Sequence, residues 1–127
     1  MEIGAHSVSH RMLSRLDLRQ KTEEIASSKK ALDEKLGSQV GSFAYPFGYP
    51  WTFDRECEDI VRREYRFCCT SEWGLNYESA LKSEGLSRLK RIGIDAADSI
   101  DDFIAKARGD WDYMAVIQRA KQFFRKS

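Results

Sequence analysis

Apolar residues recur at helical spacing through the first third of the chain. Four of them share one helical face: Leu18, Ile25, Leu32 and Leu36. Asp17 followed by Gln20 three residues later forms a capping-box pattern, and Gly37 is typical of a helix C-terminus. Lys29 interrupts the apolar stripe, so we expect a helix that lies on the surface of the domain.

Short apolar segments alternate with the helical ones. The predicted strands are Ile3–Ala5, Val40–Tyr45, Tyr65–Thr70 and Arg91–Ile94. Further helices are predicted from an N-cap at Thr52 to about Arg63, from Ser99 to Gly109, and over an amphipathic terminal segment, 111–127. This alternation predicts an α/β fold with a parallel sheet or barrel, in which chemistry lies on the loops that follow the strands. We see no domain boundary, so 1–127 is interpreted as one domain.

Composition and charge narrow the classes of partner. Hydrophobic residues make up 42% and charged residues 32% of the 127 positions, which is typical of one globular domain. Because 21 Lys and Arg nearly balance 20 Asp and Glu, nothing favours a nucleic-acid partner. The three cysteines are odd in number and show no metal-binding spacing, so we expect reduced, buried thiols.

Neither end of the chain carries a clear targeting signal. The segment Met1–His6 lacks a basic region followed by an apolar stretch, and no apolar run is long enough to span a bilayer. As the sequence stands, this predicts a cytoplasmic protein, provided that Met1 is the natural start. The basic and apolar residues of 118–126 favour a helix with a solvated basic face over an anionic membrane surface.

The main candidate for chemistry is a pair of histidines. His6 and His10 are the only histidines of the chain and follow the first predicted strand. Residues four apart in a helical turn face the same side, so both imidazoles could bind one cation. Ser7 and Ser9 could hold the turn through hydrogen bonds to its backbone. Taken alone the pair is weak evidence, because ordinary loop histidines show the same spacing and a catalytic metal normally has three protein ligands.

Several stretches, in order and spacing, resemble the polysaccharide deacetylase family. Ile3–His10 is similar to the family's second motif, and Glu24–Leu32 is similar to the helix after it. Phe43–Gly48 is similar to the third motif. The family's downstream pattern is matched by Tyr65–Thr70, Gly74–Asn76 and Leu89–Ile92. The resemblance implies an α/β fold that is part of a distorted (β/α) barrel. It also implies a carbohydrate N-deacetylase, a hydrolase that removes N-acetyl groups from amino-sugar polysaccharides or oligosaccharides.

The resemblance also implies a cofactor and roles for individual residues. His6 and His10 match two of the three metal ligands, and the metal is expected to be zinc, with cobalt or manganese as alternatives. The metal polarises the acetamide carbonyl and activates a water. The backbone N–H of Phe47 matches a donor that stabilises the oxyanion. Chitin-like oligomers, peptidoglycan and exopolysaccharide intermediates all carry N-acetylated amino sugars, and the sequence does not distinguish among them.

The chain also departs from the family pattern. The metal-binding Asp and the general-base Asp belong to the family's first motif, yet no Asp precedes Asp17. Ala44 stands where an Arg often orients the base, and no third histidine is present to act as general acid. We therefore expect a C-terminal portion of the catalytic domain that is inactive alone, with a missing N-terminal segment or a second copy completing the barrel.

Five residues are candidates for substrate binding, and each has a structural alternative. They are Tyr45, Pro46, Trp51, Trp73 and Arg91. Tyr45 and Trp51 could form an apolar wall against a sugar ring or could simply pack beside the proline-containing loop. Trp73 could line the same groove or cover the core, and Arg91 could be a structural ion-pair partner.

A second class of function remains open from the sequence. A non-catalytic binding or assembly module, derived from the same fold and completed by a partner chain, would also need to cover an incomplete sheet. A metal-storage or metal-sensing domain built on the histidine pair would need further ligands, and the sequence offers no candidates for them.

Overall fold

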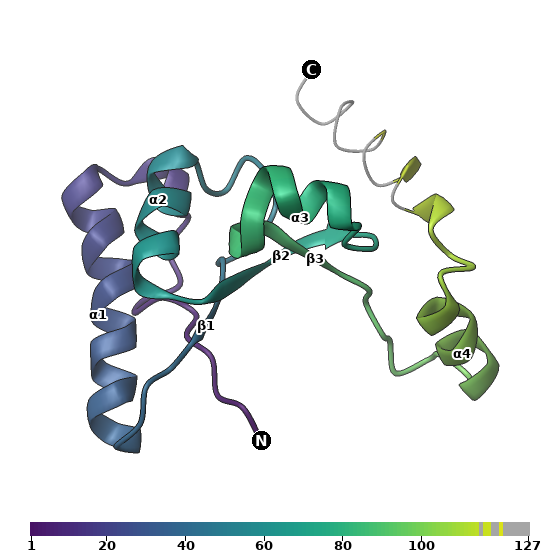
Figure 1. Cartoon of the computed structure of the whole chain (residues 1–127), viewed down its shortest axis with the longest axis horizontal. Helices are drawn as coiled ribbons and strands as arrows, with labels where there is room; N and C mark the ends of the chain where they lie inside the picture. Colours follow the sequence, from purple (N-terminus) through teal and green to yellow (C-terminus); the bar gives the residue numbers. More distant parts are fainter. Residues whose placement is uncertain (115, 118–119, 121–127) are drawn as a thin grey trace.

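The computed structural model describes residues 1–114, 116, 117 and 120, with only the backbone described at Ala80, Ser83 and Glu84 (Figure 1). Three parallel strands form one sheet in the order β1, β2, β3: β1 is Ser42–Ala44, β2 is Phe67–Trp73 and β3 is Leu89–Arg91. The predicted α/β class with a parallel sheet is therefore confirmed. Within the described residues the sheet is open, so it forms only part of a barrel.

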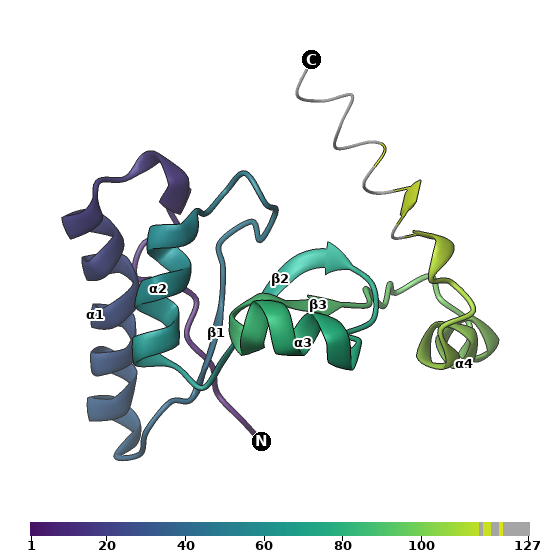
Figure 2. The same ribbon diagram turned by 45° about the horizontal axis from the view of Figure 1, so that its top comes forward.

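Helices connect these strands. The α-helices are α1 (Leu18–Leu36), α2 (Arg55–Glu64), α3 (Glu78–Glu84) and α4 (Ile100–Arg108), and the 3-10 helices are η1 (Leu13–Arg15) and η2 (Gly85–Arg88). In Figures 1 and 2, α1 and α2 lie side by side, whereas α4 lies at the far end of the molecule beyond β3. None of the described helices is long and apolar enough to cross a lipid bilayer.

Helix α1 begins and ends where the sequence predicts. Asp17 and Gln20 form the reciprocal capping box, and Gly37 takes the left-handed conformation, with φ of 63°. The buried residues of α1 are mostly polar: Lys21, Glu24, Ile25 and Ser28. Of the predicted apolar stripe, Ile25 is buried and Leu32 packs against the core, whereas Leu18 and Leu36 at the two ends of the helix are exposed.

Helix α2 begins two residues later than predicted. Its N-cap is Asp54, whose carboxylate accepts a hydrogen bond from the Cys57 N–H at 3.1 Å. Thr52 is buried instead, and its hydroxyl donates to the Tyr49 carbonyl at 2.7 Å. This hydroxyl therefore stabilises the preceding turn and does not cap the helix. Asp and Thr are both good caps, so local sequence alone did not decide between them. The buried residues of α2 are Cys57, Ile60 and Val61.

The segments at 3–5 and 74–94 also differ from the prediction. The strand expected at 3–5 is reduced to a single parallel bridge between Ala5 and Phe43. Helix α3 was not predicted, because its N-cap Tyr77 makes no side-chain cap. The parallel neighbours β2 and β3 need a crossover connection, which is usually a helix. Strand β3 begins at Leu89, two residues before the predicted start at Arg91.

One face of the sheet packs against α1 and α2 and forms the core. The core residues from these elements and their loops are Ala5, Leu13, Leu16, Ile25, Val40, Phe43, Tyr45, Phe53, Cys57, Ile60, Val61, Tyr65 and Cys68. The Tyr45 and Phe53 rings stack with centroids 3.9 Å apart. The core therefore lies between β1 and the two helices, and it fixes the loops at the carboxyl end of that strand.

Helix α4 has the predicted ends. Ser99 and Asp102 form a second capping box, and Gly109 is left-handed with φ of 88°. The predicted terminal helix at 111–127 falls largely on residues outside those that the structure describes.

Candidate functional site

Residues 6–12, which carry both histidines and are called the histidine loop, follow Ala5 in the chain and lie beside the carboxyl end of β1. The Ala5 N–H donates to the Ser42 carbonyl at 2.8 Å, and the Ala44 N–H donates to the Ala5 carbonyl at 2.9 Å. These two bonds align the start of the chain with β1 and place His6 directly after the paired segment. His6 thus lies at the edge of a parallel sheet where functional groups are expected.

The ring of His6 is oriented by the backbone of β1. Its Nδ1 atom lies 2.8 Å from the carbonyl oxygen of Ala44. Because a carbonyl oxygen only accepts hydrogen bonds, Nδ1 carries the proton and donates it. In the neutral imidazole Nε2 then keeps its lone pair, and this is the tautomer that a metal ligand requires.

The two imidazoles lie together at the surface. The centroids of the His6 and His10 rings are 4.9 Å apart with an interplanar angle of 67°, and both side chains are exposed. The His10 ring also contacts the ring of Phe47, at 4.8 Å and 65°. The structure therefore brings together three of the residues predicted for the site: His6, His10 and Phe47.

Unusual backbone conformations are concentrated at this cluster. Ser7, His10 and Phe47 have φ of 65°, 57° and 62°, and they are the only non-glycine residues with positive φ in the described part of the chain. The Ser7 hydroxyl accepts a hydrogen bond from the His10 N–H at 3.0 Å, which closes the turn between the histidines. Such strained residues occur mainly at binding sites and active sites, where the surrounding structure holds them.

Helix α1 contributes a carboxylate that holds the histidine loop. Glu24 accepts hydrogen bonds from the Val8 N–H at 3.0 Å, from the Ser9 N–H at 2.9 Å and from the Ser9 hydroxyl. Burial alone would raise the pKa of the Glu24 carboxyl, but the hydrogen bonds from Ser9 and Val8 hold it below its ordinary value. Glu24 was not predicted as a site residue. It does begin the stretch Glu24–Leu32 that resembles the helix after the family's second motif, but that resemblance gave it no role at the site.

The Phe47 loop is a tight turn that presents a backbone N–H. The Pro46 carbonyl accepts from the Gly48 N–H at 2.7 Å, so Phe47 is the central residue of a three-residue turn with positive φ. Among the described residues, none accepts a hydrogen bond from the Phe47 N–H. Gly48 lies against β2, where its carbonyl accepts from the Ser71 N–H at 2.8 Å. The Phe47 N–H is therefore available to a ligand.

The predicted aromatic wall is not formed by Tyr45. Its side chain is only 1% exposed, and its hydroxyl donates to the Ser87 carbonyl at 3.1 Å, so it packs in the core. Pro46 is also buried. Trp51 is half-buried and stacks on Tyr49 at 5.0 Å. For Tyr45 the structure agrees with the packing alternative.

Trp73 and Arg91 lie at the ends of β2 and β3. The Lys106 ammonium of α4 lies 5.6 Å from the Trp73 ring, so Trp73 contributes to the docking of α4. The Arg91 guanidinium donates to the Thr70 carbonyl at 2.6 Å and to the Ser71 hydroxyl at 3.1 Å. Arg91 thus supports β2, the strand against which Gly48 packs. None of these contacts brings Arg91 to the histidine pair.

The donor set fits a divalent metal only in part. Two imidazoles with the correct tautomer at His6 are suitable nitrogen ligands for zinc and related ions. Within the described ranges, however, no group of three or more His, Cys, Asp or Glu side chains could hold a metal ion. The residues present therefore supply two ligands, and a third must come from elsewhere for a catalytic site.

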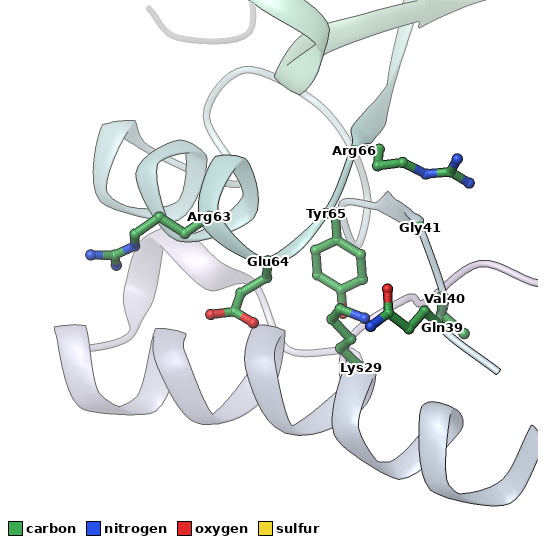
Figure 3. A pocket seen from close by; sticks show the side chains of 8 residues that line it. All are labelled: Lys29, Gln39, Val40, Gly41, Arg63, Glu64, Tyr65 and Arg66. Atoms are coloured by element: carbon green, nitrogen blue, oxygen red, sulfur yellow. The ribbon is translucent and has the colours of Figure 1, made fainter. Parts of the chain in front are cut away.

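One hollow of the described surface is separate from this site. It has a volume of about 420 Å³ and is lined by residues of α1, α2 and the loops that precede β1 and β2: Lys29, Gln39, Val40, Gly41, Arg63, Glu64, Tyr65 and Arg66 (Figure 3). It lies at the amino ends of the strands, whereas the histidine loop lies at their carboxyl ends. In Figure 3 the side chains of Arg63 and Arg66 point away from each other, so they do not converge on one ligand.

Comparisons with known proteins agree with this geometry. A family model described as polysaccharide deacetylase matches residues 1–64. The chain is 26% identical to the Streptococcus pyogenes deacetylase PplD, solved in complex with acetate, with a TM-score of 0.71 over 81% of this chain and 43% of that one. A polysaccharide deacetylase from Bacillus cereus is 24% identical, with a TM-score of 0.71 over 83% of this chain and 31% of that one.

No curated protein sequence matches the chain at a significant level. The chain spans less than half the length of the two solved structures. The family model covers half of the chain, and it includes the histidine loop, α1, β1 and the Phe47 turn. The chain therefore belongs to the polysaccharide deacetylase family.

Proposed function

We propose that this chain contributes part of the active site of a metal-dependent polysaccharide N-deacetylase. His6 and His10 are two ligands of a divalent cation, with zinc as the preferred ion, and the substrate is an N-acetylated amino-sugar polymer. The observation that carries the proposal is the histidine pair itself. Its ring centroids lie 4.9 Å apart just after the bridge residue Ala5, and the hydrogen bond of His6 Nδ1 to the Ala44 carbonyl leaves Nε2 of His6 available to a metal.

The chemistry of the site divides between the cation and the protein. A bound divalent cation would polarise the acetamide carbonyl and lower the pKa of a water molecule. The Phe47 N–H, which has no acceptor among the described residues, would donate a hydrogen bond to the oxygen on which negative charge develops. The turn around Phe47 is fixed by the contact of Gly48 with β2, so this donor would be oriented before substrate binds.

The chain lacks other groups that hydrolysis requires. No carboxylate joins the histidines within the described residues, and the only two imidazoles of the sequence are already assigned as ligands. We propose that a further polypeptide segment supplies a metal-binding carboxylate and a general base. On this account the isolated 127-residue chain binds a metal but releases no acetate from an N-acetylglucosamine oligomer.

A non-catalytic assembly module is the second candidate, and the open sheet favours it. The three strands of the described residues do not close into a barrel, so a partner chain could extend the sheet. Such a module would need neither an oriented imidazole nor a cation. Metal binding by the histidines therefore distinguishes the two candidates.

Titration calorimetry with zinc, under reducing conditions, tests the proposal on the 127-residue chain. We expect one site in the wild-type chain and at least about tenfold weaker binding in each of His6→Ala and His10→Ala, because each removes one of two ligands. Cys69→Ala is the matched control, since Cys69 is a half-buried thiol on β2. Wild-type affinity in both histidine variants would contradict the proposal and favour the assembly module.

A further inference from the structure

The loop that carries the two histidines has no apolar anchor of its own. Ala5 and Leu13 are buried on either side of it, but none of the side chains at 6–12 is buried. Val8, the most apolar residue of the loop, is 62% exposed. Hydrophobic packing therefore fixes the two ends of the segment and leaves the conformation between the histidines to polar contacts.

One carboxylate supplies most of these polar contacts. Glu24 Oε2 accepts from the backbone N–H groups of both Val8 and Ser9, and Oε1 accepts from the Ser9 hydroxyl. The Glu24 side chain is itself held firmly, because Glu24 is only 7% exposed and the adjacent Ile25 is fully buried in the core. Hydrogen bonds to an ionised carboxylate are stronger than those between neutral groups.

The contacts of Glu24 lie between the two ligands in the sequence. Val8 and Ser9 connect the left-handed residue Ser7 to the left-handed residue His10. If the Val8 and Ser9 amides were released, the strained conformations on both sides could relax to ordinary ones. The distance between the imidazoles would then no longer be fixed.

We propose that Glu24 is a positioning residue that holds the histidine loop in its metal-binding conformation through Val8 and Ser9. The inference rests on the proposed function, because it assigns to α1 a role in the same metal site. The alternative is that Glu24 contributes only to the stability of the fold, as any buried and hydrogen-bonded carboxylate does. The two roles differ in whether the zinc affinity of the folded chain depends on Glu24.

Variants of the 127-residue chain separate these roles. We expect Glu24→Ala to weaken zinc binding by about 10–100-fold, the usual effect of removing a group that orients a ligand. Glu24→Gln keeps one carbonyl acceptor for the loop amides and should recover part of that loss. Glu23→Gln is the matched control, because Glu23 is an exposed neighbour that pairs with Arg19 at 3.1 Å and should leave the affinity unchanged.

Each variant is also unfolded with urea, so that affinity is compared only among folded chains. Should Glu24→Ala fail to fold, Glu24→Gln and Ser9→Ala decide the question, and each is expected to bind zinc several-fold more weakly than wild type. Folded Glu24 variants that bind zinc as tightly as wild type would overturn this inference while the metal site stands. A wild-type chain that binds no zinc would overturn both the inference and the metal site beneath it.

Discussion

The conformation of single residues decides how the candidate site is built. Ser7, His10 and Phe47 all have positive φ without being glycine, and all three lie at the histidine cluster. The sequence predicted the residue types at this site from the spacing of the histidines and the family motifs. It did not predict the strained backbone, because only tertiary contacts hold side-chain-bearing residues in that region.

Gly48 provides a prediction at the residue scale. A Cβ at position 48 would lie 2.5 Å from both the backbone nitrogen and the hydroxyl oxygen of Ser71, and φ is 69°. Gly37 has a similar φ of 63° but nothing within 4 Å of such a Cβ. Gly37→Ala should therefore cost about 1–2 kcal/mol in free energy of unfolding, from conformation alone. Gly48→Ala should cost about 1–3 kcal/mol more, from overpacking.

Urea denaturation of both variants measures this difference. Equal destabilisation by the two substitutions would show that the Phe47 turn does not depend on its close contact with β2.

At the scale of elements, helices α1 and α2 are joined by a buried cation. The Lys21 side chain is 5% exposed, and its ammonium lies 2.6 Å from carboxylate oxygens of both Asp54 and Glu56. Asp54 is also the N-cap of α2, so the same carboxylate caps that helix and forms an ion pair with α1. This arrangement was not predicted, because Lys21 and Asp54 are 33 residues apart and a lysine is rarely assigned to a helix core.

The pair gives a prediction with a definite dependence on pH. Partial burial would raise the pKa of the Asp54 carboxyl, but hydrogen bonds from Lys21 and Cys57 hold it below its ordinary value of 3.8. A lowered pKa in the folded state stabilises the fold above that value, and this stability is lost as the pH falls through the folded pKa. Lys21→Met should therefore destabilise the chain by about 1–3 kcal/mol at pH 7. The difference from wild type should narrow below about pH 4.

Urea unfolding of both chains from pH 7 to pH 3 provides the measurement. Arg19→Met is a suitable control, because Arg19 lies on the same helix and its pair with Glu23 is exposed. A difference between wild type and Lys21→Met that stays constant over this pH range would show that Asp54 draws no stability from Lys21.

Helices with capping residues at their ends were predictable from the sequence, whereas a helix without them was not. The caps Asp17 and Ser99 and the stop at Gly37 are local, so α1 and α4 were placed correctly. Helix α3 has no side-chain cap. The contact of Glu24 with Ser9 spans 15 residues and depends on how α1 packs, which the sequence pattern does not encode.

At the scale of the whole molecule, the candidate site lies at one end of the sheet, which is open within the described residues. The core behind β1 fixes the histidine loop and the Phe47 turn side by side, while α4 lies far from them beyond β3 (Figure 2). The α/β class was predictable because strands and helices alternate along the chain. The central claim for the molecule is that this end of the sheet binds a divalent cation through His6 and His10.

Nitrogen NMR of the two imidazoles during zinc titration tests that claim most directly, since the chain has no other histidines. We predict that Nδ1 of His6 stays protonated on the Ala44 carbonyl, while zinc shifts the Nε2 resonance of His6 and one ring nitrogen of His10. Imidazole resonances that do not respond to zinc, or binding through Nδ1 of His6, would contradict the account.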